Sequence, residues 1–581
     1  MSSPGWTIEE NQLFRDGIAA DLDLLRKCAA DLRSSELQLV MSRLMLTPSL
    51  VASGHFPGGM SVSLCVRLSD QRFELSPAQD HLVVGKRMHA VDRELQSRLV
   101  ELAATHVGDI SSMTGPEYVS LLAEPLLQGL LVDEVSRVAA VEAVEPVSPA
   151  TVEASGLQAS LYPYQAEGVA AMLVLSQSEV GALLGDEMGL GKTLQVIALL
   201  SLELDKGQSL VICPGSLIEN WRRELSQFAP HLSVAVHHGP GRGTLPDRFP
   251  ASDVVVSTYE TVTNDIAFLE DRRFNLVVLD EAQMVKNPDA SRSTAIKRLQ
   301  RRIGVAVTGT PLENSLVDLW SLAEFVHPGL LGRRESFLTS FPDESAAAEQ
   351  LGHIMGPVTI RRSVEKVALE LPPLIETMRP MRMDQTLQNR YDRVLASGDG
   401  LEINTQLRVV AAHADEAEES FGESQKNEFV LLQLDRILRM PEKALIFCDF
   451  RRTLDRLFSL LRKEFPSTYV QIIDGKTERS ERQSIVDAFS SGSGGAVLLL
   501  NPRAAGVGLN ITAANHVFHY SPNYNPAVTE QATKRAHRQK QLRPVFVHHL
   551  YYLDSVEERA AEIAKSKAAL AVALDEGLRN D

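Results

Sequence analysis

The stretch GDEMGLGKTLQ, Gly185 to Gln195, follows the apolar run VGALL (180–184) and precedes a helical pattern. A glycine-containing turn between a strand and a helix directs several backbone N–H groups at one point, and the helix dipole adds to their attraction for phosphate oxygens. The strict pattern G-x-x-x-x-G-K-[ST] requires a glycine where this chain has Asp186. Gly189 and Gly191 still allow a ligand to approach the backbone without a Cβ in the way. The stretch therefore predicts a variant phosphate loop.

This loop predicts a binding site for ATP and Mg²⁺. We expect Lys192 to reach the β and γ phosphates of ATP, and the Thr193 hydroxyl to ligate Mg²⁺. The residues that we predict to bind the nucleotide here are Asp186, Glu187, Met188, Gly189, Leu190, Gly191, Lys192 and Thr193.

An acidic pair supports the nucleotide site. The run VVLDEAQ places Asp280 and Glu281 at the end of a buried strand, where carboxylates are costly unless they serve a cation or a water molecule. We expect Asp280 to hold Mg²⁺ through water, and Glu281 to orient and deprotonate the attacking water. A helix cap is the alternative explanation, and the preceding phosphate loop disfavours it. TGTP, Thr308 to Pro311, ends the next strand and adds hydroxyl groups beside the same crevice.

Two series of short apolar runs predict the fold class. Continuous Val/Ile/Leu runs that end in polar or turn residues are typical of buried parallel strands. The two series indicate an α/β fold with two doubly wound parallel-sheet lobes in tandem and helical protrusions, with ligand residues at the carboxyl ends of the strands. The runs are 180–184, 209–214, 253–259, 275–282 and 304–310, then 443–450, 470–475, 495–501, 515–522 and 544–552.

The first part of the chain has a different pattern. From Trp6 to Leu44 apolar residues recur at three- and four-residue spacing, which predicts helices, whereas residues 61–76 alternate like a hairpin. We expect a mixed, mainly helical N-terminal domain, and a loop at 412–428. The predicted divisions are 1–138 for that domain, 139–156 for a linker, 157–372 for lobe one, 373–442 for a helical connector, and 443–581 for lobe two.

Composition excludes several classes of protein. The chain has 581 residues, 44% of them hydrophobic, and a net charge of -17, which argues against a generally basic nucleic-acid coat but permits a local basic groove. Four scattered cysteines form neither a disulfide framework nor a CxxC metal site. No signal peptide or apolar run of membrane-spanning length is readable. We expect a cytoplasmic, nucleoid-associated protein without a membrane partner.

The motifs and their order resemble those of the Swi/Snf-type ATPases of helicase superfamily two. The resemblance runs from about Leu157 to Lys567, and the positions that depart from the family pattern include Ala505, Tyr524 and Lys540. The segments that carry it are LYPYQAEGV (161–169), GDEMGLGKT (185–193), DEAQ (280–283), TGTPLEN (308–314), NPRAAGVGLNIT (501–512), YNPAVTEQATKRAHRQKQ (524–541) and VEERAAEIAKSK (556–567).

The resemblance implies roles for further residues. It implies RecA-like lobes, adenine recognition by Gln165, and a helix at 556–567 that braces the two lobes. Arg535 and Arg538, at i and i+3 on a helix, would act as arginine fingers on the γ-phosphate, with Gln531 one turn earlier. The residues that would contact nucleic-acid phosphates are Ser216, Thr258, Lys286, Lys476 and Arg503.

The resemblance also implies an activity. We expect a DNA-dependent ATPase that translocates on double-stranded DNA and remodels or displaces bound proteins, in bacterial antiphage defence or in transcription recycling. The alternatives are a strand-separating or RNA-directed helicase, and an adaptor that senses DNA or ATP. The N-terminal domain carries no recognisable motif, and we expect it to bind a protein partner, to gate the DNA path or to inhibit the ATPase.

Overall fold

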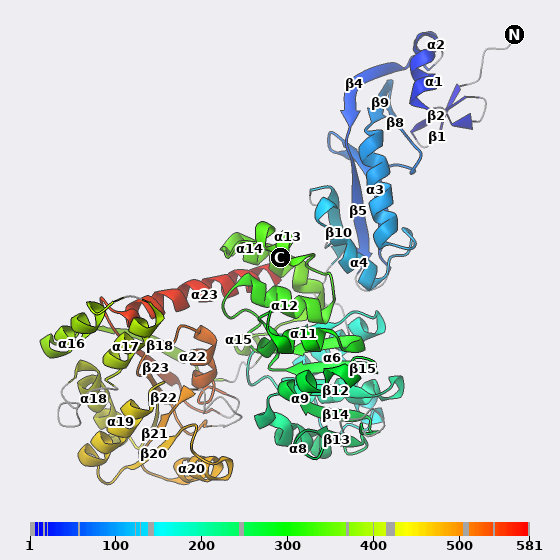
Figure 1. The fold of residues 1–581 in the computed structure, drawn as a ribbon. Helices are drawn as coiled ribbons and strands as arrows, with labels where there is room; N and C mark the ends of the chain where they lie inside the picture. Colours follow the sequence, from blue (N-terminus) through cyan, green and yellow to red (C-terminus); the bar gives the residue numbers. More distant parts are fainter. Residues whose placement is uncertain are drawn as a thin grey trace.

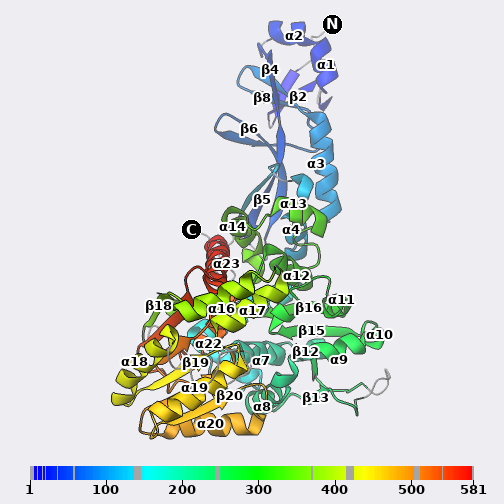
Figure 2. The same ribbon diagram turned by 60° about the vertical axis from the view of Figure 1, so that its left-hand side comes forward.

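The protein consists of an N-terminal domain, two α/β lobes and a long C-terminal helix that runs from one lobe to the other (Figures 1 and 2). The structure is a computed structural model. It describes residues 6–9, 11–15, 18–19, 21–35, 37–55, 59–122, 124–127, 129–136, 145–242, 249–367, 371–398, 400–413, 424–502, 511–538 and 541–578. Among these residues, no helix has the length and apolar character needed to cross a membrane.

Lobe one contains a parallel sheet of seven strands in the order β13-β14-β12-β15-β16-β11-β17. Its central strands are buried along most of their length because helices cover both faces, and this explains their uninterrupted apolar runs. The strands are β11 (Ala182–Leu184), β12 (Ser209–Cys213), β13 (Val234–His237), β14 (Val254–Thr258), β15 (Arg273–Asp280), β16 (Gln300–Val307) and β17 (Thr359–Ile360). The five strands predicted in this lobe are confirmed; β13 and β17 were not predicted.

The helices of lobe one follow its strands in the alternation expected of a doubly wound fold. They are α6 (Pro163–Gln177), α7 (Lys192–Leu202), α8 (Ile218–Phe228), α9 (Tyr259–Asn264), α10 (Ile266–Leu269), α11 (Ser291–Lys297), α12 (Leu316–Val326), α13 (Arg334–Ser340), α14 (Ser345–Met355) and α15 (Val364–Val367).

Lobe two has a parallel sheet of six strands in the order β18-β23-β22-β19-β21-β20. All five predicted strands are present, and β18 (Leu374–Met381) is an additional edge strand paired in parallel with β23. The predicted helical connector therefore begins with a strand of this sheet. The other strands are β19 (Lys443–Phe447), β20 (Tyr469–Ile473), β21 (Ala496–Leu500), β22 (His516–His519) and β23 (Val545–Tyr552); the helices are α16 (Gln385–Leu395), α17 (Leu401–Ala411), α18 (Gln425–Arg439), α19 (Arg451–Glu464), α20 (Arg479–Ser491) and α22 (Pro526–Thr533).

The N-terminal domain is mixed, as expected, but strands rather than helices dominate it. The helical period predicted over residues 6–44 is confirmed in α1 and α2 but was wrong for β1, β2, β3 and β4. Asn11 takes a left-handed backbone (φ 61°) and turns β1 back onto β2. The predicted hairpin is confirmed by the antiparallel pairing of β6 and β7. The strands are β1 (Trp6–Glu9), β2 (Gln12–Arg15), β3 (Ile18–Ala19), β4 (Val40–Leu46), β5 (Pro48–His55), β6 (Ser61–Leu68), β7 (Gln71–Glu74), β8 (His81–Val84), β9 (Arg87–Val91) and β10 (Leu131–Ser136); the helices are α1 (Leu22–Lys27), α2 (Ala29–Ser34), α3 (Arg93–His106) and α4 (Gly115–Leu122).

The described part of the predicted linker packs on lobe one. It includes the short helix α5 (Pro149–Ala154), which is capped by Ser148, and its Val152 side chain is buried. Buried apolar residues of the N-terminal domain from Leu46 to Val135 form one continuous core with those of lobe one, whereas Leu13, Leu25, Leu32, Leu39, Val83 and Met88 form a separate cluster. The N-terminal domain is therefore joined to lobe one by packing and not only by the chain.

The C-terminal helix α23 (Val556–Leu578) connects the lobes, as the predicted brace helix would. It starts beside β23 of lobe two and ends against α14 of lobe one. Midway along it, Lys567 Nζ donates to Asn314 Oδ1 of lobe one (2.9 Å) and to the Tyr524 carbonyl of lobe two (3.0 Å).

Candidate active site

The phosphate loop connects β11 to α7, and its glycines adopt the backbone that the sequence predicts. Gly189 and Gly191 have φ of 94° and 72°, in the left-handed region that favours glycine, and Gly191 is the N-cap of α7. A Cβ on Gly191 would overlap the Gln165 side-chain amide. The strand registers pair Leu184 and Asp280 with the same residue of β16, Val307. The loop and the acidic pair therefore lie at one edge of the sheet.

Lys192 is enclosed by this loop. Its Nζ donates to the carbonyl oxygens of Asp186 (2.8 Å) and Glu187 (3.2 Å). Burial lowers the pKa of Lys192, and the nearby carboxylates of Glu281, Asp186 and Asp280 oppose that shift. An ammonium group that donates to loop carbonyls is well placed to exchange them for phosphate oxygens.

Asp186 explains the missing glycine of the strict pattern. Its side chain is fully buried (0% exposed). The carboxylate accepts hydrogen bonds from Arg362 Nε (2.9 Å), Arg362 Nη2 (2.5 Å), the Arg362 backbone N–H (3.0 Å) and Gln195 Nε2 (3.0 Å). The side chain therefore fastens the loop to the segment after β17 and to α7, and it is the backbone of Asp186 that faces Lys192.

The acidic pair follows β15 in an unusual backbone. Asp280 accepts from Trp221 Nε1 (2.8 Å) and from the Glu281 backbone N–H (3.0 Å). Burial, and then the neighbouring Glu281, raise the pKa of Asp280 above its ordinary value. Glu281 has φ of 52°, which is rare and strained for a residue with a side chain and is found preferentially at functional sites. Because ionised carboxylates are unfavourable here without compensation, the pair suits a bound cation.

A hydrogen-bond chain joins Glu281 to the TGTP segment. Gln283 Nε2 donates to Glu281 Oε2 (2.7 Å), and Thr308 Oγ1 donates to Gln283 Oε1 (2.9 Å). The Thr308 hydroxyl thus orients the Gln283 amide, which holds the predicted base in one position. The expectation that TGTP adds a hydroxyl beside the crevice is confirmed.

The donors at this site fit Mg²⁺. Hydroxyl and carboxylate oxygens are the ligands that Mg²⁺ prefers, and it is usually held by one or two protein carboxylates together with phosphates and water. Thr193, in the first turn of α7, and Asp280 would hold it. Within the described ranges there is no group of three or more His, Cys, Asp or Glu residues that would form an all-protein metal site.

The second lobe brings basic residues against the phosphate loop. The Arg538 side chain lies beside Gly189, with its Cγ 3.3 Å from where a Cβ on that glycine would be. Arg535 is buried; burial and Arg538 lower its pKa to about 10, against the attraction of Glu281. Lys534 Nζ lies 3.0 Å from Glu187 Oε2. Both predicted arginine fingers therefore face the nucleotide site.

The backbone that carries these arginines is not the predicted helix. Helix α22 ends at Thr533, and turns follow it: Arg535 N–H donates to the Ala532 carbonyl (3.2 Å) and Ala536 N–H to the Thr533 carbonyl (3.0 Å). The i, i+3 helical spacing was therefore wrong, although the arginines point to the expected cleft. Gln531, half-buried in α22, precedes them.

Gln165 has structural partners in this structure. Its Oε1 accepts from the Tyr162 N–H (3.0 Å), and its Nε2 donates to the Leu190 carbonyl (3.1 Å). The Tyr162 and Tyr164 rings stack beside it, with centroids 5.9 Å apart. Gln165 therefore supports the phosphate loop, and its recognition of adenine stays a prediction.

The predicted nucleic-acid contacts lie in different environments. Lys286 pairs with the buried Glu313, and the Thr258 hydroxyl is buried as the cap of α9, accepting from Thr261 N–H (3.1 Å). Ser216 is half-buried after β12, and Lys476 is exposed in a turn of lobe two. Arg503 lies outside the described residues. The contacts to nucleic acid stay predictions, with Lys476 the most accessible of the described four.

Sequence reasoning did not predict several residues that shape this site. Arg362 holds Asp186 and donates to the Tyr164 carbonyl; Arg361 Nη1 donates to the Gly185 carbonyl (2.9 Å). Trp221 fixes Asp280, and Lys534 reaches Glu187. The signals were present in TIRRS, NWRRE and QATKRAHR, but basic and aromatic residues in short motifs do not indicate their partners.

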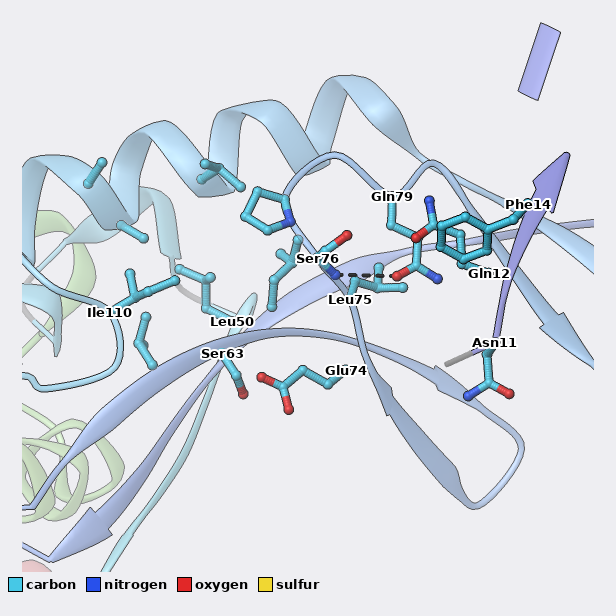
Figure 3. Close-up of a pocket in the computed structure, with 16 residues that line it drawn as sticks. Asn11, Gln12, Phe14, Leu50, Ser63, Glu74, Leu75, Ser76, Gln79 and Ile110 are labelled. Carbon is cyan, nitrogen blue, oxygen red and sulfur yellow. Dashed lines mark hydrogen bonds between the residues drawn. The ribbon is translucent and has the colours of Figure 1, made fainter. Parts of the chain in front are cut away.

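A separate cavity of about 830 Å³ lies in the N-terminal domain (Figure 3). Leu50, Leu75 and Ile110 line it together with polar residues such as Gln79 and Glu74. None of the residues that line it belongs to the nucleotide site.

Comparison with known proteins gives two domain matches in tandem. Residues 164–434 match the SNF2-related domain, and residues 429–540 match the helicase conserved C-terminal domain. The two matched ranges contain every predicted residue of the nucleotide site.

Individual relatives agree with the domain matches. The chain is 34% identical over 446 residues to the predicted ATP-dependent helicase/translocase YwqA of Bacillus subtilis, covering 71% of this chain and 48% of that protein. It is 30% identical over 480 residues to the Zorya protein ZorD of Escherichia coli, covering 71% and 44%. The chain spans about half the length of the curated relatives it matches.

Among solved structures, the chain is similar to the Sulfolobus solfataricus SWI2/SNF2 ATPase core in complex with double-stranded DNA. The two sequences are 30% identical, the match covers 72% of this chain and 94% of that one, and the TM-score is 0.39.

Proposed function

The chain belongs to the SNF2-related family of ATP-dependent helicases and translocases, and from this premise we propose that it is a DNA-dependent ATPase that moves along double-stranded DNA and displaces or remodels bound proteins. The main support for this proposal is that residues of both lobes lie at one nucleotide site. The phosphate loop, Lys192 and the acidic pair come from lobe one, and Arg535 and Arg538 come from lobe two.

Each lobe contributes a different part of the hydrolysis reaction. Lys192 and the backbone N–H groups at the start of α7 bind the β and γ phosphates, and Mg²⁺, when bound by Thr193 and Asp280, neutralises phosphate charge. Glu281, oriented by Gln283, accepts a proton from the attacking water. Arg535 and Arg538 stabilise the charge that develops on the γ-phosphate, a contribution worth ~10³–10⁵ in rate when it comes from an arginine finger. Hydrolysis therefore depends on how closely lobe two approaches.

Two lobes that approach and separate with each ATP would move stepwise along one strand of a duplex. Contacts from Lys476, Arg503, Ser216, Thr258 and Lys286 would go to phosphates, which position a protein without reading base sequence. We expect weak sequence preference and a steep fall of affinity with salt, because each neutralised phosphate releases counterions. The SWI2/SNF2 core solved with double-stranded DNA supports duplex as the track.

The N-terminal domain is the proposed site for a protein partner. Its charged residues are mostly acidic, and strand β4 exposes Leu44 and Met45 (54% and 59%) at the edge of a sheet, which suits a protein better than nucleic acid. We propose that the protein acts with this partner either in antiphage defence or in recycling of RNA polymerase. Replacing Leu44 and Met45 with glutamate is expected to abolish co-purification of the partner and to leave ATP turnover unchanged; retained co-purification would contradict this surface.

The ATPase assignment is tested by two substitutions in lobe one. We expect Lys192→Ala to abolish turnover together with ATP binding, and Glu281→Gln to abolish turnover while ATP binding persists. ATP turnover and binding of a fluorescent ATP analogue measure the two effects. Unchanged turnover in either variant would show that the assigned residues do not form the active site.

A further inference from the structure

Lys534 connects lobe two to the phosphate loop. Its side chain is 10% exposed, and its ammonium group lies between two carboxylates, Glu187 Oε2 at 3.0 Å and Glu530 Oε1 at 2.6 Å. Glu530 lies one turn earlier in α22 and is 46% exposed, whereas Glu187 lies in the other lobe and is 24% exposed. Burial opposes the charge of Lys534, but the carboxylates of Glu530 and Glu187 outweigh it and raise the pKa of Lys534. The ammonium group therefore stays charged across the cleft.

Glu187 is the point where lobe two meets the catalytic loop. Its Oε2 also accepts from the Val364 backbone N–H (3.1 Å), which fixes the carboxylate relative to α15. Its backbone carbonyl accepts from Lys192 Nζ (3.2 Å). The same residue thus contacts Lys534 through its side chain and Lys192 through its backbone. Burial alone would raise the pKa of Glu187, but Lys534 and the Val364 N–H lower it.

The position of Lys534 in the chain makes this contact relevant to the arginines. Lys534 is the C-cap of α22, with its backbone N–H donating to the Glu530 carbonyl (2.9 Å), and Arg535 is the next residue. Because the backbone leaves the helix at this residue, the helix alone does not set the direction of the segment that carries Arg535 and Arg538. An anchor to lobe one at Lys534 would set it.

We propose that Lys534 is a positioning residue that, by pairing with Glu187 of the phosphate loop, sets the register in which Arg535 and Arg538 enter the nucleotide site. The pair is formed in the same structure in which Lys192 contacts the loop carbonyls. Its role is to align the two lobes, and it does not touch the reacting atoms. The inference rests on the proposed function, because it takes the two arginines as the groups being positioned.

The test separates turnover from binding in the full-length protein. With duplex DNA saturating, Lys534→Gln is expected to lower kcat by about 10- to 100-fold, since small displacements of catalytic groups can cost on the order of 10² in rate. The KM for ATP and the affinity for a non-hydrolysable analogue should change by less than about twofold, because the groups that hold ATP in lobe one are intact. Lys534→Arg should restore most of kcat. The matched control is Glu530→Gln, which removes the partner on the same helix and should leave kcat unchanged.

A double-substitution cycle identifies the partner. If Glu187 and Lys534 act as one unit, Glu187→Gln combined with Lys534→Gln should lower kcat no further than Lys534→Gln alone. The inference would be overturned if the kcat losses of the two single variants multiply in the double variant. It would also be overturned by a kcat for Lys534→Gln within twofold of the unaltered protein, or by an equal loss of kcat in Glu530→Gln. Arg535→Ala in the same assay distinguishes its failure from that of the proposed function. An inactive Arg535→Ala beside a fully active Lys534→Gln removes only the positioning role, whereas an active Arg535→Ala removes the finger assignment itself.

Discussion

Asp186 illustrates how one residue departs from a pattern without losing its function. A glycine at that position would leave Arg362 buried (7% exposed) without a carboxylate. Asp186 instead neutralises Arg362, from which its carboxylate accepts three hydrogen bonds, and it accepts a fourth from Gln195, so the first turn of the phosphate loop is held by side chains. Gly189 and Gly191 supply the left-handed backbone that the loop needs.

The first prediction concerns this buried pair. Asp186→Asn preserves the side-chain volume but leaves the Arg362 charge uncompensated, and removing one partner of a buried pair costs about 3–5 kcal/mol of unfolding free energy. Chemical denaturation measures it. The control is Asp289→Asn, which breaks a pair with Arg334 whose side chains are 68% and 35% exposed and is expected to cost less than about 1 kcal/mol. Equal, small effects at the two positions would contradict the structural role of Asp186.

At the scale of single residues, the sequence predicted types of side chain better than their partners. Lys192, Asp280 and Glu281 were recognisable because a phosphate loop and a strand-end acidic pair are motifs of neighbouring residues. Trp221 and Arg362 were not, because their partners lie 59 and 176 residues away and no local pattern records such a contact. The burial of Thr258 as a helix cap was not predicted either, because the residue type does not show whether a threonine is exposed or buried.

At the scale of elements, the crossing of α14 and α23 depends on two glycines. A Cβ on Gly352 would overlap the Leu574 carbonyl and lie 2.7 Å from Gly577 Cα, and a Cβ on Gly577 would overlap the backbone of Glu349. The two helices therefore pack backbone against backbone. Near the end of α23, Asp575 pairs with Arg361, which donates to the Gly185 carbonyl of the phosphate loop (2.9 Å). The close crossing places the end of α23 next to the nucleotide site.

The sign of the change in unfolding free energy on replacing Gly352 with alanine tests this crossing. In an ordinary helix interior, replacing glycine with alanine stabilises by roughly 0.5–1 kcal/mol. Gly352→Ala is expected to do the opposite and to cost about 1–3 kcal/mol, the usual range for overpacking. Thermal or chemical unfolding followed by circular dichroism measures the change. Gly356→Ala, at the end of the same helix with nothing within 4 Å of the new Cβ, serves as the control. A stabilised Gly352→Ala would show that the helices do not approach this closely.

The elements differed in how well the sequence predicted them. All ten apolar runs became strands of the two parallel sheets, because strands buried on both faces leave a continuous apolar record. Strand β18 was missed because it is an edge strand without a buried residue, and polar residues and a proline interrupt its apolar ones, LIETMRPM. The N-terminal strands were mistaken for helix because three- and four-residue spacing also arises in short strands separated by turns.

At the scale of the whole molecule, the lobes are joined by a set of contacts around the nucleotide site. Asn525 Nδ2 of lobe two lies 3.3 Å from Glu313 Oε2 of lobe one, Lys567 of α23 donates to both lobes, and Lys534 pairs with Glu187. Of these contacts, the one between Lys534 and Glu187 reaches the phosphate loop itself. The relative position of the lobes, which no local sequence pattern specifies, is therefore what determines whether the arginines reach the phosphates.

We propose that approach and separation of the two lobes with each ATP drive the protein along an intact duplex. The most direct measurement places a fluorescent third strand on a blunt-ended DNA duplex and follows its release with ATP, beside ATP turnover with duplex DNA, single-stranded DNA and RNA. We expect that duplex DNA stimulates turnover most, that the third strand is released only with ATP and not by Glu281→Gln, and that the duplex strands stay paired. Separation of the duplex strands, or stimulation by single strands or RNA alone, would contradict it.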